Sequence, residues 1–148
     1  MNVHSHLSEA DKAELRAAAK AVQVNAYAPY SRFPVGAAVR AASGKVYVGV
    51  NVENASYPVG CCAERSAIAA AITAGERELV AVHVVTIAAR AVYPCGMCAQ
   101  ALREHGPDML VIAEGADEDP QEVPLKQILP YAYAGEGLPG NPTPERLP

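Results

Sequence analysis

Three cysteines and one glutamate have residue types and spacings that suit metal chemistry. Cys95 and Cys98 form a C-x-x-C pair, which lets both sulfurs face one metal ion, and Cys62 lies about thirty residues earlier. All three are expected in the first turns of helices, where the helix dipole stabilises thiolate, the form that binds zinc. Three thiolates leave the fourth tetrahedral position of zinc open for water, as a catalytic site requires.

Glu64 and Arg65 follow Cys62 closely. A carboxylate two residues beyond a ligand can lie beside the bound water without ligating the metal, and it can move a proton from water to substrate. A guanidinium next to it can offset the net negative charge that three thiolates leave on Zn²⁺. The pattern therefore predicts a zinc-dependent hydrolase in which Glu64 is the catalytic acid/base.

Other interpretations of these residues exist. Buried cysteines are often small apolar core residues, and Glu64 and Arg65 could be ordinary solvated helix charges. A structural zinc site is the stronger alternative; it normally has four protein ligands, and Cys61 is the spare thiol. The combination of C-x-E with P-C-x-x-C favours catalysis, because zinc nucleobase deaminases carry this signature with His in the place of Cys62.

The segments that must position these residues alternate between helix and strand. Helical periodicity and stop signals predict helices at about 9–26, 63–74 and 95–105. Crowded β-branched residues predict strands at 35–42, 45–52, 79–88 and 109–113, the first two joined as a hairpin through Ser43-Gly44. The order predicts an α/β fold, a three-layer α-β-α sandwich with one mixed β-sheet.

The C-terminal part of the chain is expected to be less regular. Residues 114–122 include five acidic side chains and predict an exposed loop, and 125–129 predict one helical turn that ends at Pro130. From Gly135 onward Gly and Pro dominate. We therefore expect a catalytic domain over 1–134 and a poorly ordered tail over 135–148.

The composition limits the classes of partner. The formal net charge of −4 argues against a protein that grips nucleic-acid phosphates over a broad surface. No apolar run approaches the ~20 residues of a membrane span, and the N-terminus lacks a signal-peptide core. We expect no nucleic-acid or membrane partner and a cytoplasmic location, where thiols stay reduced.

Five stretches resemble the family of small homotetrameric zinc-dependent cytidine deaminases. They are APYSRFPVGAA at 28–38, NVENASY at 51–57, CAER at 62–65, PCGMC at 94–98 and ILP at 128–130. The resemblance runs from roughly residue 15 to 133. It implies the cytidine deaminase fold and pyrimidine salvage chemistry: hydrolysis of cytidine and deoxycytidine to uridine and deoxyuridine with release of ammonia, by zinc-activated hydroxide attack on C4.

The resemblance also implies roles for residues around the metal. Cys62, Cys95 and Cys98 would be the zinc ligands, Glu64 the proton shuttle, and Arg65 a hydrogen-bond donor to the thiolates. The family often has Arg and Gln after the last of these cysteines, whereas Ala and Gln follow it here. This difference affects the local support of that helix and removes no ligand.

Five further residues would bind substrate in a member of this family. Asn51 and Glu53 would hydrogen-bond the ribose 3′-hydroxyl, Phe33 would pack against the pyrimidine, and the backbone of Ala63 would read the base edge with the catalytic glutamate. Tyr133 stands near the position of a family phenylalanine and could close the pocket of a neighbouring subunit. From the residues alone, Asn51 and Glu53 share one side of a strand end, but turn chemistry for Asn51 and solvation for Glu53 are favoured over sugar binding, and Phe33 suits the core better than a stack on the ligand.

The expected partners are a small nucleoside and further copies of the chain, a homotetramer with composite active sites. The segment 63–74 is apolar nearly all round, which leaves surface for subunit contacts, although Tyr131 and Tyr133 could instead cover their own core. Two alternatives stay open: a deaminase of another aminopyrimidine nucleoside such as blasticidin S, and a non-catalytic zinc-stabilised binding module. A nucleic-acid editing role is a third, disfavoured by the acidic balance.

Overall fold

The computed structural model describes residues 7–135, which are built around a five-stranded sheet. Its strands are β1 (Gly36–Ala41), β2 (Val46–Val50), β3 (Leu79–Val85), β4 (Leu110–Glu114) and β5 (Gln121–Pro124). The order across the sheet is β2-β1-β3-β4-β5, with β3 and β4 parallel and the other neighbours antiparallel. The sheet is therefore mixed, as predicted.

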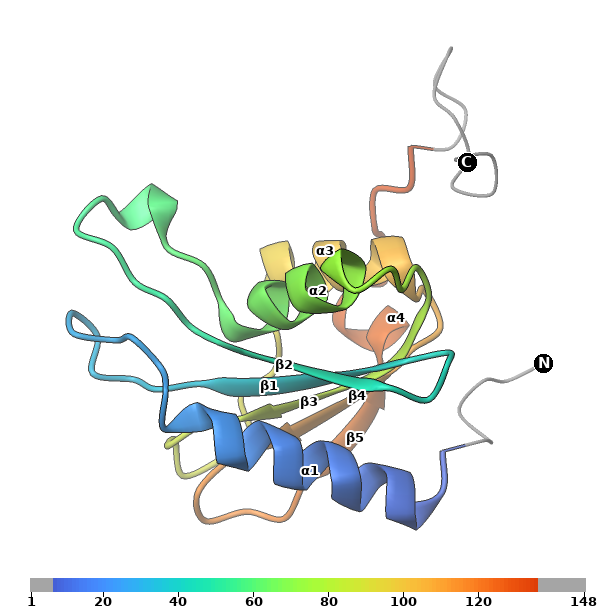
Figure 1. The fold of residues 1–148 in the computed structure, drawn as a ribbon, viewed down its shortest axis with the longest axis horizontal. Helices are drawn as coiled ribbons and strands as arrows, with labels where there is room; N and C mark the ends of the chain where they lie inside the picture. Colours follow the sequence, from blue (N-terminus) through green and yellow to red (C-terminus); the bar gives the residue numbers. More distant parts are fainter. Residues whose placement is uncertain (1–6, 136–148) are drawn as a thin grey trace.

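Helices cover both faces of the sheet (Figure 1). One face carries α1 (Glu9–Gln23), and the other carries α2 (Ala63–Thr73), α3 (Gly96–His105) and the single turn α4 (Leu125–Ile128). A short 3-10 turn, η2 (Tyr57–Val59), lies at the tip of an arm that extends beyond the sheet. The three-layer α/β architecture predicted from the sequence is confirmed.

The helix α1 begins at a capping box, in which Ser8 and Asp11 satisfy each other's backbone N–H groups. Leu15 and Ala19 are fully buried against the sheet. The helix ends about three residues earlier than predicted, because the chain turns there into an extended segment in which Tyr27 bridges to Val52. This segment leads to the loop that carries Phe33.

The helix α2 packs closely on β2, and a glycine makes the approach possible. A Cβ added at Gly49 would lie 2.2 Å from the backbone nitrogen of Ala67, so only glycine fits there. The helix gives way to a turn at Gly75, as the sequence predicts. The close contact fixes the N-terminus of α2 above one end of the sheet.

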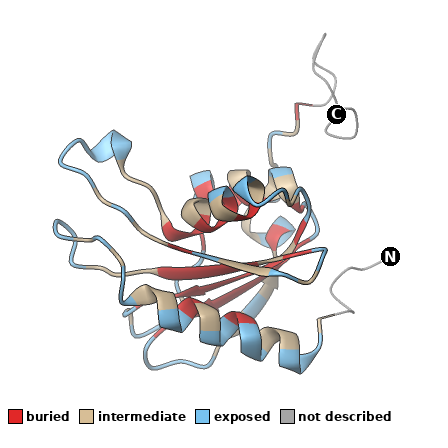
Figure 2. Cartoon of the chain, viewed as in Figure 1, coloured by how far each residue is buried: buried red, intermediate tan, exposed pale blue. Residues whose placement is uncertain are grey.

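Two apolar clusters among the described residues hold the layers together, one on each face of the sheet. The buried residues, red in Figure 2, lie on the strands and on the helices of both outer layers. The cluster under α1 includes Leu15, Ala19 and Ile112, and the cluster under α2, α3 and α4 includes Ile68 and Leu102. Buried strands with long apolar runs are expected when helices cover both faces. No helix of residues 7–135 combines the length and the apolar character needed to cross a bilayer.

The acidic stretch 114–122 differs from the predicted exposed loop. Glu114 is the last residue of β4, is only 3 % exposed and receives hydrogen bonds from Arg16. Residues 121–124 form β5, which pairs with β4. Residues 116–119 between the two strands are exposed, and so is Glu122 within β5. The prediction was wrong at both ends of the stretch, because charge pairing and an available sheet edge outweigh local polarity. The predicted tail beyond residue 135 lies outside the described residues.

Candidate metal centre and active site

Three thiols converge where α2 and α3 begin. Cys62 is the N-cap residue of α2, Cys95 is the N-cap residue of α3, and Cys98 is buried in the first turn of α3. Their sulfurs all lie within 4.8 Å of one another. Thiolates at about 2.3 Å from a tetrahedral zinc ion lie about 3.8 Å apart, so the cluster fits zinc with little adjustment.

The surroundings of the cluster favour the thiolate form at Cys62. A hydrogen bond from the Cys98 thiol, helped by the Arg65 guanidinium, lowers the pKa of Cys62. The same shared proton and burial raise the pKa of Cys98. Both helix N-termini point their positive ends at the sulfurs, which adds to the stabilisation of negative charge there.

The spare thiol does not join the cluster. Cys61 lies 3.6 Å from the hydroxyl of Ser66 and 3.6 Å from the backbone oxygen of Cys62, outside the group of sulfurs. Among residues 7–135 no fourth side-chain ligand completes the set. This arrangement leaves one coordination position open and disfavours the alternative of a closed structural zinc site.

Arg65 connects the thiol cluster with the backbone just before α2. Its Nη2 donates to the backbone oxygen of Gly60 at 3.1 Å, and its charge lowers the pKa of the Cys62 thiol. Its buried Nε has no hydrogen-bond partner among the described residues. The negative charge of thiolates in the cluster would balance the charge of this guanidinium, in agreement with the position predicted for Arg65 beside the metal ligands.

Glu64 combines deep burial with a position beside the thiols. The residue is only 6 % exposed, and this burial raises the pKa of its carboxyl group above the ordinary value. The nearby Cys62 adds to this effect. A carboxyl group whose pKa is moved toward neutrality is suited to taking up and releasing a proton.

A pocket of about 460 Å³ opens beside the cluster, within the range of about 300–1,000 Å³ expected for a small-molecule site. Seven of the residues singled out in the sequence line it: Phe33, Asn51, Glu53, Cys62, Ala63, Glu64 and Cys95. The chain thus brings two of the three expected metal ligands, the expected acid/base and four of the five expected substrate-binding residues to one cavity.

Six other residues line the same pocket and were not expected: Ser31, Val35, Val84, Thr86, Val92 and Tyr93. The last four come from the C-terminal end of β3 and from the loop that leads to Cys95. Ligands in α/β sheets gather at the carboxyl ends of strands, and this rule could have identified them once β3 was placed.

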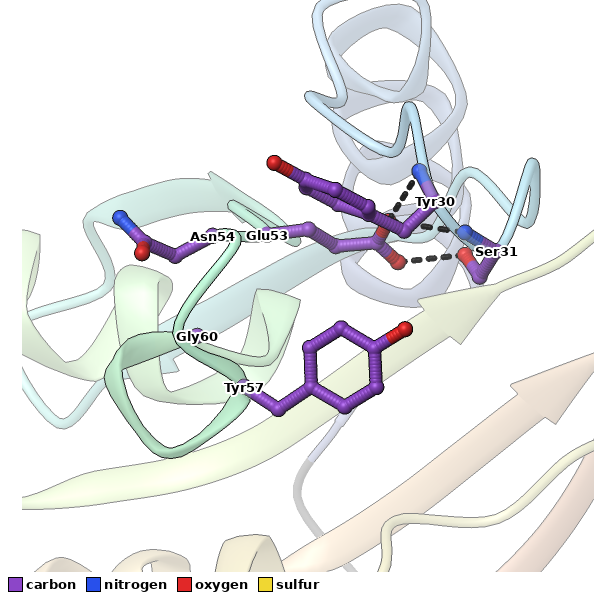
Figure 3. Close-up of a pocket in the computed structure, with 6 residues that line it drawn as sticks. All are labelled: Tyr30, Ser31, Glu53, Asn54, Tyr57 and Gly60. Atoms are coloured by element: carbon purple, nitrogen blue, oxygen red, sulfur yellow. Dashed lines mark hydrogen bonds between the residues drawn. The ribbon is translucent and has the colours of Figure 1, made fainter.

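Asn51 and Glu53 hold the loop that forms one wall of the pocket. The Asn51 amide accepts from Val35 N at 2.9 Å and donates to Phe33 O at 2.8 Å. The Glu53 carboxylate accepts from the backbone N–H groups of Tyr30 and Ser31, each at 3.0 Å, and from the Ser31 hydroxyl (Figure 3). The Ser31 bonds lower the pKa of Glu53, which stays ionised.

Tyr133 lies away from this pocket. Its backbone oxygen accepts from Gln100 Nε2 at 2.8 Å, which ties the segment after α4 to α3. The residue is 66 % exposed and Tyr131 is 97 % exposed, so neither covers the core of its own chain. Ala99, which stands where the family often has Arg, is fully buried and packs α3 into the core.

Comparisons with known proteins agree with this site. The profile of the cytidine and deoxycytidylate deaminase zinc-binding region matches residues 9–114. A cytidine deaminase of Halalkalibacterium halodurans is 44 % identical over 114 residues, which are 76 % of this chain and 86 % of that protein. One from Mycobacterium tuberculosis is 39 % identical over 125 residues, 84 % and 91 % of the two chains.

The fold is also shared. The crystal structure of cytidine deaminase from Burkholderia pseudomallei matches with a TM-score of 0.79 at 40 % identity, covering 86 % of this chain and all of that one. The chain therefore belongs to the family of zinc-binding cytidine and deoxycytidylate deaminases. It is a zinc-dependent enzyme of that family, and its three clustered thiols can hold the metal.

Proposed function

We propose that the protein hydrolyses the 4-amino group of cytidine and deoxycytidine, giving uridine or deoxyuridine and ammonia. One observation carries the proposal: three thiols lie within 4.8 Å of one another, and two of them line one pocket together with the buried carboxyl group of Glu64. The cytidine deaminases named above support the choice of substrate. When bound by the three cysteines, zinc supplies the Lewis acidity that makes a water molecule nucleophilic near neutral pH.

Glu64 moves the protons in this reaction. Its carboxylate takes one proton from the attacking water as the water oxygen adds to C4, and delivers that proton to N3 of the base. It then carries the remaining hydroxyl proton to the 4-amino group. The C4–N bond breaks, ammonia leaves, and a carbonyl remains at C4 while N3 keeps its proton. The raised pKa of Glu64 suits a group that must both accept and donate.

The rest of the pocket binds and orients the nucleoside. Phe33 packs against the pyrimidine, and the backbone N–H of Ala63 reads the base edge at the start of α2. The Asn51 amide uses one N–H for Phe33 O, which leaves its second N–H for the ribose 3′-hydroxyl. The ionised carboxylate of Glu53 accepts from the same hydroxyl. Positioning of this kind lets the reacting C4 meet the metal centre.

We also propose that the enzyme is a homotetramer whose active sites are completed by neighbouring subunits. Large apolar side chains are exposed after α1, at η2 and after α4; they include Val24, Tyr57, Val59, Tyr131 and Tyr133. Such surface is typical of contacts between subunits. Tyr133 is free of its own core and could close a neighbour's pocket over the base by stacking. All four cysteines are unpaired, which suits the reducing cytoplasm.

Ammonia release from a panel of nucleosides tests the proposed reaction. Cytidine and deoxycytidine should release ammonia with zinc-loaded protein, and blasticidin S should react much more slowly. Cys95→Ser should lower the zinc content below one ion per chain and abolish turnover. Activity only on blasticidin S would identify another aminopyrimidine as the substrate. A zinc-loaded protein without activity on any of the three would support the binding module.

Light scattering and mixed oligomers test the assembly. Scattering should give about four times the chain mass of 15.5 kDa. Oligomers formed from Glu64→Gln and Tyr133→Ala chains should be more active than either parent, because some sites would combine an intact Glu64 with a neighbour's intact Tyr133. An active monomer would contradict the proposal, and a tetramer without rescue would remove Tyr133 from the shared site.

A further inference from the structure

The loop between β3 and α3 leads to Cys95 and also forms part of the pocket wall. Residues 86–94 carry the chain from the end of β3 to Cys95, and they contribute Thr86, Val92 and Tyr93 to the pocket wall. The loop contains neither helix nor strand. Contacts with the rest of the protein therefore contribute to holding the loop in one position.

These contacts come from the acidic segment after β4. The N–H groups of Ala116 and Asp117 donate to the backbone oxygens of Ala88 and Ala89, at 2.6 Å and 3.1 Å. Gly115 packs against the loop so closely that an added Cβ would lie 2.4 Å from the carbonyl carbon of Arg90. The segment 115–118 thus lies directly against the loop along several residues.

One side chain adds to these backbone contacts. The Glu118 carboxylate accepts from Ala91 N at 2.7 Å, the distance of a charge-assisted hydrogen bond. Ala91 lies immediately before Val92 and Tyr93, so this bond is made at the point where the loop becomes the pocket wall. Among residues 7–135, no other side-chain hydrogen bond joins the acidic segment to this loop.

We propose that Glu118 is a positioning residue for the active site. By holding Ala91 it sets where Val92 and Tyr93 stand against the bound nucleoside, and so determines how well the pocket fits its substrate. Glu118 touches neither the substrate nor the metal and acts only through the loop. This inference rests on the proposed deamination of cytidine, which supplies the assay.

Steady-state kinetics of zinc-loaded variants test the proposal. Glu118→Ala should raise KM for cytidine about tenfold while kcat stays within about twofold, since misplacing a positioning group by 1 Å can cost up to about 10². Glu118→Gln keeps an acceptor oxygen and should restore KM to within about threefold of the parent. Zinc content should stay at one ion per chain in both, because the thiols are unchanged.

Two further variants keep the test decisive. Asp117→Ala removes the same charge from the same segment but no side-chain bond, and should leave KM unchanged. Gly115→Ala pushes on the loop at Arg90 and should raise KM, as Glu118→Ala does. Equal KM in Glu118→Ala and the parent enzyme, or an equal rise in Asp117→Ala, would overturn the proposal. A parent enzyme inactive on cytidine would instead refute the proposed function, and uridine binding by calorimetry would then report the fit of the pocket.

Discussion

Two buried glutamates lie on opposite faces of the same sheet, and they differ in what surrounds them. Glu64 is 6 % exposed and Glu114 is 3 % exposed. Burial raises the pKa of Glu64, which lies beside thiols. Burial would also raise the pKa of Glu114, but hydrogen bonds from Arg16, Lys20 and His83 outweigh it and lower the pKa to about 2.

The difference separates a reactive site from a structural one. The Glu114 carboxylate accepts from Arg16 at 2.6 Å and 2.9 Å, pairs with Lys20 at 2.7 Å and meets His83 Nε2 at 3.0 Å. A carboxylate with this many partners has a fixed charge and links α1 to the sheet. Glu64 lines a pocket, and burial raises the pKa of its carboxyl group. Breaking a buried charge pair destabilises a fold, whereas a carboxyl group whose pKa is raised by burial is suited to proton transfer.

The largest expected effect is on the rate at Glu64. Glu64→Gln keeps the shape and the polarity but cannot transfer a proton, so kcat for cytidine should fall by a factor on the order of 10²–10⁴. The free energy of unfolding should change by less than about 1 kcal/mol, because no ion pair is lost. Kinetics and denaturant unfolding of the same preparation measure both quantities, and zinc analysis checks that the metal content is unchanged. A loss of rate below about tenfold would make Glu64 a bystander.

Glu114→Gln should have the converse effect. It leaves Arg16 and Lys20 without their anion, and the free energy of unfolding should fall by about 1–3 kcal/mol. The kcat value should stay within about twofold, since Glu114 lies across the sheet from the pocket. Glu122→Gln is the matched control: that exposed residue pairs with Lys12, so it should cost less than about 1 kcal/mol. A large loss of kcat at full stability in Glu114→Gln would contradict the comparison.

The pH dependence of stability should also distinguish Glu114. A carboxyl group with a lowered pKa in the folded state contributes stability above its unfolded pKa, and that contribution is lost as pH falls through the folded value. The stability difference between the parent and Glu114→Gln should therefore be constant above about pH 5 and shrink toward pH 2. Urea titrations at intervals of pH measure it. A difference that grows as pH falls would show that the carboxylate is not stabilised by its partners.

The smallest effect is expected at the rim of the Glu114 cluster. Lys20 pairs with Glu114, but its side chain is 50 % exposed, and water solvates much of its charge. Lys20→Ala should lower the free energy of unfolding by less than about 1 kcal/mol, with kcat unchanged. Thermal and denaturant unfolding of this variant and of Glu114→Gln would show which of the two residues, the buried carboxylate or its exposed partner, contributes more to the free energy of unfolding. If Lys20→Ala lost as much free energy of unfolding as Glu114→Gln, the exposed lysine would be a main source of the stability of this cluster.

The sequence was informative wherever the determining interactions are local. Helix periodicity, the turn at Ser43-Gly44 and the spacing of the cysteines depend on neighbouring residues, and these features match the structure closely. The thiol cluster was predictable because Cys95 and Cys98 share one helical turn and Cys62 begins another helix. Glu64 follows from the same helix. The chain alone therefore determined the α/β class and the group of three cysteines that can hold a metal, and it placed Glu64 beside them.

Only the tertiary structure decided which distant residues complete and support the site. The sequence around Glu114 predicts an exposed acidic loop, yet Glu114 is buried. Its partners Arg16, on α1, and His83, on the neighbouring strand β3, are about 100 and 31 residues away in the sequence. Because β3 and β4 are parallel, the segments that follow them begin at the same edge of the sheet. This places Tyr93 in the pocket wall and Glu118 against the loop that carries Tyr93. Such contacts join residues far apart in the chain, where no periodicity reports them, and they exist only once the strands have paired in register.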